Sequence, residues 1–260
     1  MTLTFLGTGT SQGVPVIACD CDVCHSSDFH DKRLRTSVIV SDSDGNNVLV
    51  DIGPDFRAQM LSHNICHLEA ILITHAHRDH VGGIDDIRPL NWVQHRNMDV
   101  YANSQAINSL KHDYHYIFEE HLYPGLPEVT LHDVSDCEPF SVGLFTITPI
   151  RGLHKDLPVL GYRFDERDGK SLAYITDMNH IDQSEKSKLN NLDLLVINAL
   201  RKQKHFSHFC LPEALEVISQ CNPRQAYLTH MSHEMGLYAA VNPSLPPTVS
   251  LAYDNLVVNL

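Results

Sequence analysis

Four residues of types that bind metal ions are crowded into the segment THAHRDH, residues 74–80. His75 and His77 are two positions apart. In an extended segment such side chains point the same way, so they can chelate one ion. Asp79 and His80 follow at once and can hold a second ion. An apolar strand is expected just before them, at residues 70–74. This density of ligands after a buried strand indicates a metal site rather than a solvated polar loop.

A second cluster consists of the thiols of Cys19, Cys21 and Cys24, in the segment ACDCDVCH. Three thiolates at this spacing can wrap a tetrahedral ion but leave one position open. His25 is the local candidate for the fourth ligand, and free thiols or a redox pair are the alternatives. The chain has seven cysteines, an odd number, and no visible export signal. Cytosolic thiols stay reduced, so metal binding is expected rather than a disulfide framework.

The HxHxDH pattern after a strand resembles the metallo-β-lactamase superfamily. The resemblance implies an α/β fold, the αββα sandwich, with a two-metal site at the edge of its sheets. It also implies three further ligands at strand ends, and the sequence offers His154, Asp177 and His230 in that order. One metal would be held by His75, His77 and His154, the other by Asp79, His80 and His230, with Asp177 bridging both. Imidazole and carboxylate ligands suit Zn, Mn or Fe.

A narrower resemblance is carried by GTGTSQGVP, CxCxxC, HxHxDH and a late HxxH together. They are similar to the PhnP-type cyclic-phosphate phosphodiesterases of the carbon–phosphorus lyase pathway. The resemblance implies a structural zinc held by Cys19, Cys21, Cys24 and His233. It also implies a small phosphodiester substrate, of the 5-phosphoribosyl 1,2-cyclic phosphate type, and a possible homodimer.

Cleavage of a phosphodiester also needs a proton for the leaving oxygen, and histidine has the pKa for that task. The segment RKQKHFSHF offers His205 and His208. Related phosphodiesterases and RNA 3′-processing nucleases place an acid histidine shortly before a helix, which favours His208. Asp79 is expected to be indispensable for catalysis.

Phosphate contacts are harder to identify from the sequence. The candidates are Arg88, Arg33 and Arg35 besides His205, although each arginine taken singly is more typical of a surface charge. Asp51 resembles a position that supports the histidine loop by hydrogen bonding.

Two other hypotheses remain open. The same site could hydrolyse a lactone, a thioester or an RNA 3′ end, or the protein could be a non-catalytic zinc-binding or sensor module built on the cysteine cluster. The net charge of −13 makes a nucleic-acid partner unlikely, because such binding rests on clustered Lys and Arg.

The elements that must position these residues can be read from hydrophobic periodicity and turn residues. We expect one domain over 1–260, with a helical insertion at about 85–127 that carries His112, His115 and His121. Strands are expected at 3–6, 36–40, 48–51, 70–74, 146–150, 161–164, 171–176, 192–198, 225–229 and 257–259, and helices at 54–62, 104–118 and 212–219. No apolar run approaches the ~18 residues of a membrane span, so we expect a cytoplasmic protein without a membrane partner.

Overall fold

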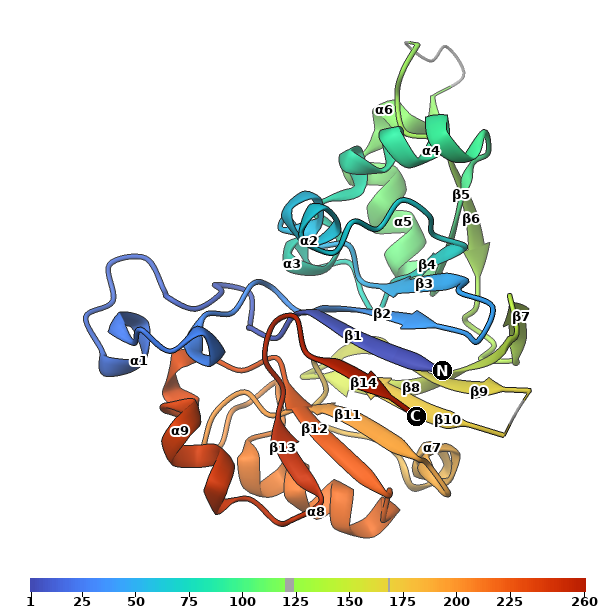
Figure 1. Ribbon diagram of the computed structural model, residues 1–260. Helices are drawn as coiled ribbons and strands as arrows, with labels where there is room; N and C mark the ends of the chain where they lie inside the picture. Colours follow the sequence, from blue (N-terminus) through green and yellow to red (C-terminus); the bar gives the residue numbers. More distant parts are fainter. Residues whose placement is uncertain (120–123, 168) are drawn as a thin grey trace.

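The chain forms two β-sheets packed face to face, with helices on both outer faces (Figure 1). The computed structural model describes residues 1–119, 124–167 and 169–260. In spatial order the first sheet comprises β14 (Val257–Asn259), β1 (Thr2–Gly7), β2 (Ser37–Ser41), β3 (Asn47–Val50), β4 (Ala70–Leu72), β5 (Met98–Ala102) and β6 (Val129–Asp133). The second comprises β13 (Val249–Leu251), β12 (Gln225–Thr229), β11 (Leu194–Asn198), β10 (Ser171–Ile175), β9 (Leu157–Glu166), β8 (Phe145–His154) and β7 (Phe140–Val142).

The helices lie in two groups, one outside each sheet (Figure 1). The first sheet is covered by α2 (Phe56–His63), α3 (Arg78–Val81), α4 (Arg88–Gln94), α5 (Ser104–Asp113) and α6 (His115–Phe118). The second is flanked by α7 (Gln183–Lys186), α8 (Leu211–Cys221) and α9 (Tyr238–Val241), and α1 (Asp22–His25) lies in the loop after β1. The expected αββα sandwich is therefore confirmed.

Three apolar clusters correspond to the three contacts between these layers. The central one joins the inner faces of the sheets, for example Phe5 and Val50 with Tyr162 and Tyr174. The outer two join each sheet to its helices. Both faces of each central strand are thus covered, which explains why strands such as Ser171–Ile175 are buried at every position.

Most expected elements are present, and the differences coincide with contacts between segments that the expected elements did not include. The helix expected at 104–118 is interrupted at Tyr114, whose hydroxyl donates to the Val81 carbonyl at 2.9 Å. The strands expected at 146–150 and 161–164 are the middles of β8 and β9, which pair along their whole length down to His154. That hairpin brings a predicted metal ligand to the sheet edge.

The segment predicted as a helical insertion contributes more than helices. It holds α4, α5 and α6, but also β5, which pairs in parallel with β4 and β6. It is thus partly built into the first layer. His121 falls outside the described residues. No helix among the described residues is long and apolar enough to cross a membrane.

Candidate metal centre and active site

The histidine loop joins the end of β4 to the short helix α3. His75 follows β4 in an extended stretch, and His77 caps α3 with extended backbone angles. Asp79 and His80 then lie on the single turn of α3, which aims them towards the second sheet. His75 Nε2 lies 2.9 Å from His77 Nδ1, so the two rings converge as their spacing predicts.

Three more predicted ligands reach the same place from the second sheet. His154 ends β8, Asp177 follows β10, and His230 follows β12. The oxygens of Asp177 lie 2.9 Å from His80 Nε2, 2.9 Å from His230 Nδ1 and 3.5 Å from His75 Nε2. The ring of His154 lies 5.2 Å from that of His77. All seven predicted ligands are thus brought together, with Asp177 at their centre.

Asp51 supports this cluster from beneath. It follows β3 and is fully buried, and its carboxylate accepts bonds from the Thr74 backbone N–H at 2.9 Å and from His80 Nδ1 at 2.6 Å. The bond to Nδ1 leaves His80 Nε2 free to face Asp79, 3.2 Å away. A partner of this kind fixes the tautomer and orientation of a metal-binding histidine.

The backbone is strained at three of these residues. Asp51, Asp177 and His230 have φ of 63°, 55° and 55°, in the left-handed region that residues other than glycine seldom adopt. Such conformations persist only where the surrounding structure enforces them, and they concentrate at functional sites. Here each aims a side chain from a strand end into the cluster.

The electrostatics of the cluster fit divalent cations. Burial alone would lower the pKa of His80, but Asp79, Asp51 and Asp177 raise it well above its usual value. Burial would likewise raise the pKa of Asp177, but His230 and His80 hold it well below its usual range. Three carboxylates in one buried place are costly without compensating positive charge.

The histidines of the cluster also have the properties of metal ligands. Burial lowers the pKa of His154 to about 4 and that of His75 well below its usual value, which keeps both rings neutral. The buried His154 Nδ1 has no hydrogen-bond partner among the described residues, and His80 Nε2 and His230 Nδ1 face the carboxylate oxygens of Asp177. Neutral imidazoles with unshared nitrogens beside carboxylates are the donor set that Zn or Mn takes.

The cysteine cluster forms a second candidate metal site. The sulfurs of Cys19, Cys21 and Cys24 lie 3.2, 3.2 and 3.7 Å from His233 Nδ1. A tetrahedron with Zn–S of 2.3 Å and Zn–N of about 2.1 Å has S···N edges near 3.6 Å, so these separations suit zinc. Backbone and His233 hydrogen bonds lower the pKa of Cys21 to about 6, which favours a thiolate. The local candidate His25 is not part of this group.

The two candidate acids differ in their access to the cluster. His208 Nε2 points towards Asp177 Oδ1 at 3.8 Å, and its ring lies 4.5 Å from that of His154. His205 stands behind it, with its Nδ1 3.3 Å from His208 Nδ1. Ser207 Oγ contacts both rings, at 3.2 Å from His205 and 3.0 Å from His208. The geometry therefore places His208, not His205, beside the predicted metal ligands.

The three arginine candidates lie in different surroundings. Arg88 is exposed, donates to the Asp85 carbonyl, and does not line the cavity beside Asp79. Arg33 is buried and donates to Thr8 Oγ and the Ala252 carbonyl, which makes it structural. Arg35 does line that cavity, together with Arg78, which was not among the predicted phosphate contacts. The only signal for Arg78 was its position inside the metal motif.

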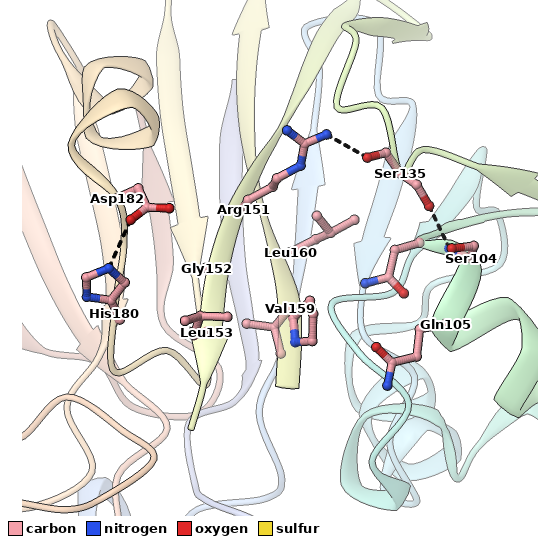
Figure 2. Close-up of a pocket in the computed structure, with 12 residues that line it drawn as sticks. Ser104, Gln105, Ser135, Arg151, Gly152, Leu153, Val159, Leu160, His180 and Asp182 are labelled. Atoms are coloured by element: carbon pink, nitrogen blue, oxygen red, sulfur yellow. Dashed lines mark hydrogen bonds and ion pairs between the residues drawn. The ribbon is translucent and has the colours of Figure 1, made fainter. Parts of the chain in front are cut away.

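A further cavity of about 340 Å³ lies along the β8–β9 hairpin that carries His154 (Figure 2). Leu153, Val159 and Leu160 form an apolar wall, while the pair His180 and Asp182 stands on one side (Figure 2). The guanidinium of Arg151 also faces this cavity but is engaged by the Ser135 carbonyl at 2.7 Å.

Comparison with known proteins agrees with this architecture. Residues 46–231 match the beta-lactamase superfamily domain. A crystal structure of a diphosphatase from the PhnP family is 38% identical, with a TM-score of 0.90 over 99% of this chain and 96% of that one. The human short-form tRNase Z, 20% identical with a TM-score of 0.72 over 100% and 99% of the two chains, shares the fold.

A curated relative is longer than this chain. The Porphyromonas gingivalis protein named octanoyltransferase is 41% identical over 98% of this chain but only 51% of its own length. The anti-Pycsar protein Apyc1 of Bacillus phage 010DV004 is 29% identical over 51% of this chain and 47% of its own length. The chain thus spans about half the length of the curated relatives it matches. From the superfamily domain and the PhnP relative together, the chain belongs to the metallo-β-lactamase superfamily and, within it, to the PhnP family.

Proposed function

We propose that this protein is a dinuclear metal-dependent hydrolase of small phosphodiesters, cyclic or nucleotide-like. The observation that carries the proposal is the convergence of the predicted ligands on Asp177, with His208 beside them. Two divalent cations at these donors would supply a nucleophile at neutral pH and positive charge around the reacting phosphate.

The chain's own residues have distinct tasks in this proposal. His75, His77 and His154 would hold one cation and Asp79, His80 and His230 the other, with Asp177 available to both. His208 delivers a proton to the leaving oxygen from Nε2, the atom that faces the cluster. Ser207 and His205, in contact with the opposite nitrogen, keep the ring in that orientation.

The cysteine site would carry a structural zinc close to this centre. Only two residues separate His233 from His230, and between them Met231 and Ser232 donate to the Thr8 and Leu200 carbonyls. A zinc at Cys19, Cys21, Cys24 and His233 would therefore stabilise the loop that presents His230. Reduced thiols are required for it, which supports a cytoplasmic location.

A second candidate substrate class is a diphosphate. It is favoured by the relative that is 38% identical over nearly the whole chain and is described as a diphosphatase. Acyl transfer is less favoured, because the relative named for it is about twice as long as this chain. A net charge of −13 disfavours a nucleic-acid substrate, and a homodimer stays a prediction.

The test compares substrates on protein loaded with Zn, Mn or Fe. The substrates are bis(p-nitrophenyl) phosphate, a ribose cyclic phosphate, a nucleoside diphosphate and p-nitrophenyl octanoate. We expect fastest turnover of a phosphodiester, and no activity in Asp79→Ala. Faster cleavage of the octanoate would overturn the substrate class, and no turnover with any metal would favour the non-catalytic zinc-binding module.

The role of His208 has its own signature. His208→Ala should lower kcat about 10²- to 10⁴-fold for a sugar leaving group. It should change p-nitrophenol release far less, because that group departs without a proton. His67→Ala removes an exposed histidine paired with Glu69 and serves as the matched control. Equal losses on both substrates, or loss of a metal ion, would mean that His208 is a ligand rather than the acid.

A further inference from the structure

The loop between β11 and α8, residues 199–210, presents His208 to the metal cluster, and we call it the acid loop. Its two ends are tied together and to the neighbouring strand end, because Leu200 donates to the Phe209 carbonyl at 3.0 Å and Phe209 donates to the Met178 carbonyl at 2.7 Å. Between these ends, residues 202–206 are exposed or half-buried. The position of this middle stretch therefore depends on side chains that bind its backbone.

Arg201 binds this stretch from the start of the loop. Its Nε donates to the Gln203 carbonyl at 3.3 Å, and its Nη2 donates to the Lys204 carbonyl at 3.1 Å. Its Nη1 donates to Glu234 Oε2 at 2.7 Å. A single guanidinium thus closes the turn that leads into His205 and also joins it to a distant segment of the chain.

That distant segment is the one that would hold the structural zinc. Glu234 directly follows His233, and its backbone N–H donates to Ser232 Oγ at 3.2 Å. Ser232 in turn donates from its backbone N–H and from its hydroxyl to the Leu200 carbonyl, at 2.9 and 3.0 Å. The zinc segment and the acid loop are therefore joined at two neighbouring residues, Leu200 and Arg201.

The contacts of Arg201 suit positioning better than overall stability. The side chains of Arg201 and Glu234 are 26% and 48% exposed, and an ion pair so open to water contributes little to the free energy of folding. A guanidinium, however, holds its donors in one rigid plane, so three acceptors bound at once are fixed relative to one another. The Lys204 carbonyl held in this way immediately precedes His205, whose Nδ1 lies 3.3 Å from His208 Nδ1.

We propose that Arg201 is a positioning residue for the acid, because it links the loop that carries His208 to the segment that would carry the structural zinc. Displacing a catalytic group by about 1 Å can cost about 100-fold in rate, so such a link affects proton transfer although Arg201 acts only through the backbone and Glu234. The cysteine site then supports the acid as well as the ligand His230. This inference rests on the proposed function and adds a residue to it.

The first experiment compares two diesters on metal-loaded protein. A ribose cyclic phosphate has a leaving oxygen that needs a proton, whereas bis(p-nitrophenyl) phosphate has one that does not. Arg201→Gln should lower kcat about 10- to 100-fold on the cyclic phosphate and far less on the other diester. Arg224→Gln removes an exposed arginine paired with Asp193 at 2.9 Å and should leave both rates unchanged. No loss in Arg201→Gln, or equal losses on both substrates, would overturn the proposal.

A double-mutant cycle asks whether Arg201 acts through His208. Residues that act as one unit are not additive, so Arg201→Gln should cause no further loss of kcat when His208→Ala is already present. Arg201→Lys keeps the charge but not the planar set of donors, and it should recover only part of the lost kcat. A further loss in the double variant, or full recovery with lysine, would contradict a positioning role.

Hydrogen exchange keeps this inference separable from the proposed function, because it needs no substrate. On protein supplied with zinc, Arg201→Gln and Cys21→Ser should each speed amide exchange in residues 201–210 about 2- to 10-fold, and the two together no more than either alone. Arg224→Gln should exchange like wild type in this loop. Unchanged exchange there in Arg201→Gln or in Cys21→Ser would refute the link, whether or not a diester is cleaved. Faster exchange without turnover of any substrate would refute the catalytic proposal and leave the link standing.

Discussion

Replacing Asp51 with asparagine should weaken metal binding without touching a proposed ligand. The carboxylate accepts from His80 Nδ1 at 2.6 Å and from Thr74 through both its backbone N–H and its hydroxyl. An asparagine can keep one oxygen for the Thr74 N–H but then directs its amide group at His80. Since that group donates, His80 must accept at Nδ1 and carry its proton on Nε2. That nitrogen faces Asp79 and Asp177 and would no longer be available to a cation.

The expected loss of metal affinity follows from the hydrogen bond between Asp51 and His80 that is lost. A hydrogen bond to a charged group contributes about 1.5–3 kcal/mol. At about 1.4 kcal/mol per tenfold, this corresponds to a loss of about 10- to 150-fold in affinity. Removing a hydrogen-bond partner of a metal-binding histidine typically lowers metal affinity by about 10- to 100-fold. This range agrees with the loss expected from the hydrogen bond.

The assay is competition with a chromophoric chelator, alongside urea unfolding of the metal-free protein. The matched control is Asp42→Asn, which also alters a buried aspartate that accepts several bonds, here in the turn between β2 and β3. Both variants should lose stability, but only Asp51→Asn should lose metal affinity. Wild-type affinity in Asp51→Asn would refute the role assigned to this carboxylate.

Three further perturbations test other parts of the account. Cys21→Ser should lower the bound metal from about three ions per chain to about two, measured by elemental analysis, and an unchanged content would disprove the structural zinc site. A Cβ on Gly152 would overlap the Met178 sulfur and lie 2.8 Å from its methyl carbon, next to Asp177. Gly152→Ala should therefore cost about 1–3 kcal/mol of unfolding free energy and reduce metal content, and an unperturbed protein would contradict this packing. Burial raises the pKa of Asp254 from its usual value of about 3.8 to about 6. Because the folded state holds this proton more tightly than the unfolded state, the raised pKa stabilises the fold below pH 3.8, and the contribution is lost as the pH rises through 6. Between these pH values, wild type should lose about 3 kcal/mol of unfolding free energy relative to Asp254→Asn, as measured by urea titration. If the difference in unfolding free energy between the two proteins did not change with pH, the pKa of Asp254 would not be raised in solution.

The sequence was most informative where ligands follow strands. The family resemblance implies three further ligands at strand ends, and His154, Asp177 and His230 could be chosen because each follows a run of apolar residues. The αββα architecture was implied by the same resemblance.

Other features depend on contacts that no local pattern records. β6 is an edge strand with half-exposed residues, so it lacks the clear apolar alternation that marks a strand. The cavity at Arg78 is lined by residues as far apart in the sequence as Ser11 and Tyr114, and such a long-range contact cannot be predicted from residue spacing. Likewise, the helix break at Tyr114 coincides with a tertiary hydrogen bond from its hydroxyl to the Val81 carbonyl.

The central claim is that the side chains around Asp177 hold a pair of cations, and anomalous diffraction tests it most directly. Crystals of protein purified with Mn and Zn should show two peaks about 3.5–4 Å apart on either side of Asp177, within bonding distance of His75 and His80. A third peak, seen in data collected at the zinc absorption edge, should lie among the sulfurs of the cysteine cluster. A single peak at Asp177, or none in metal-saturated crystals, would contradict the account.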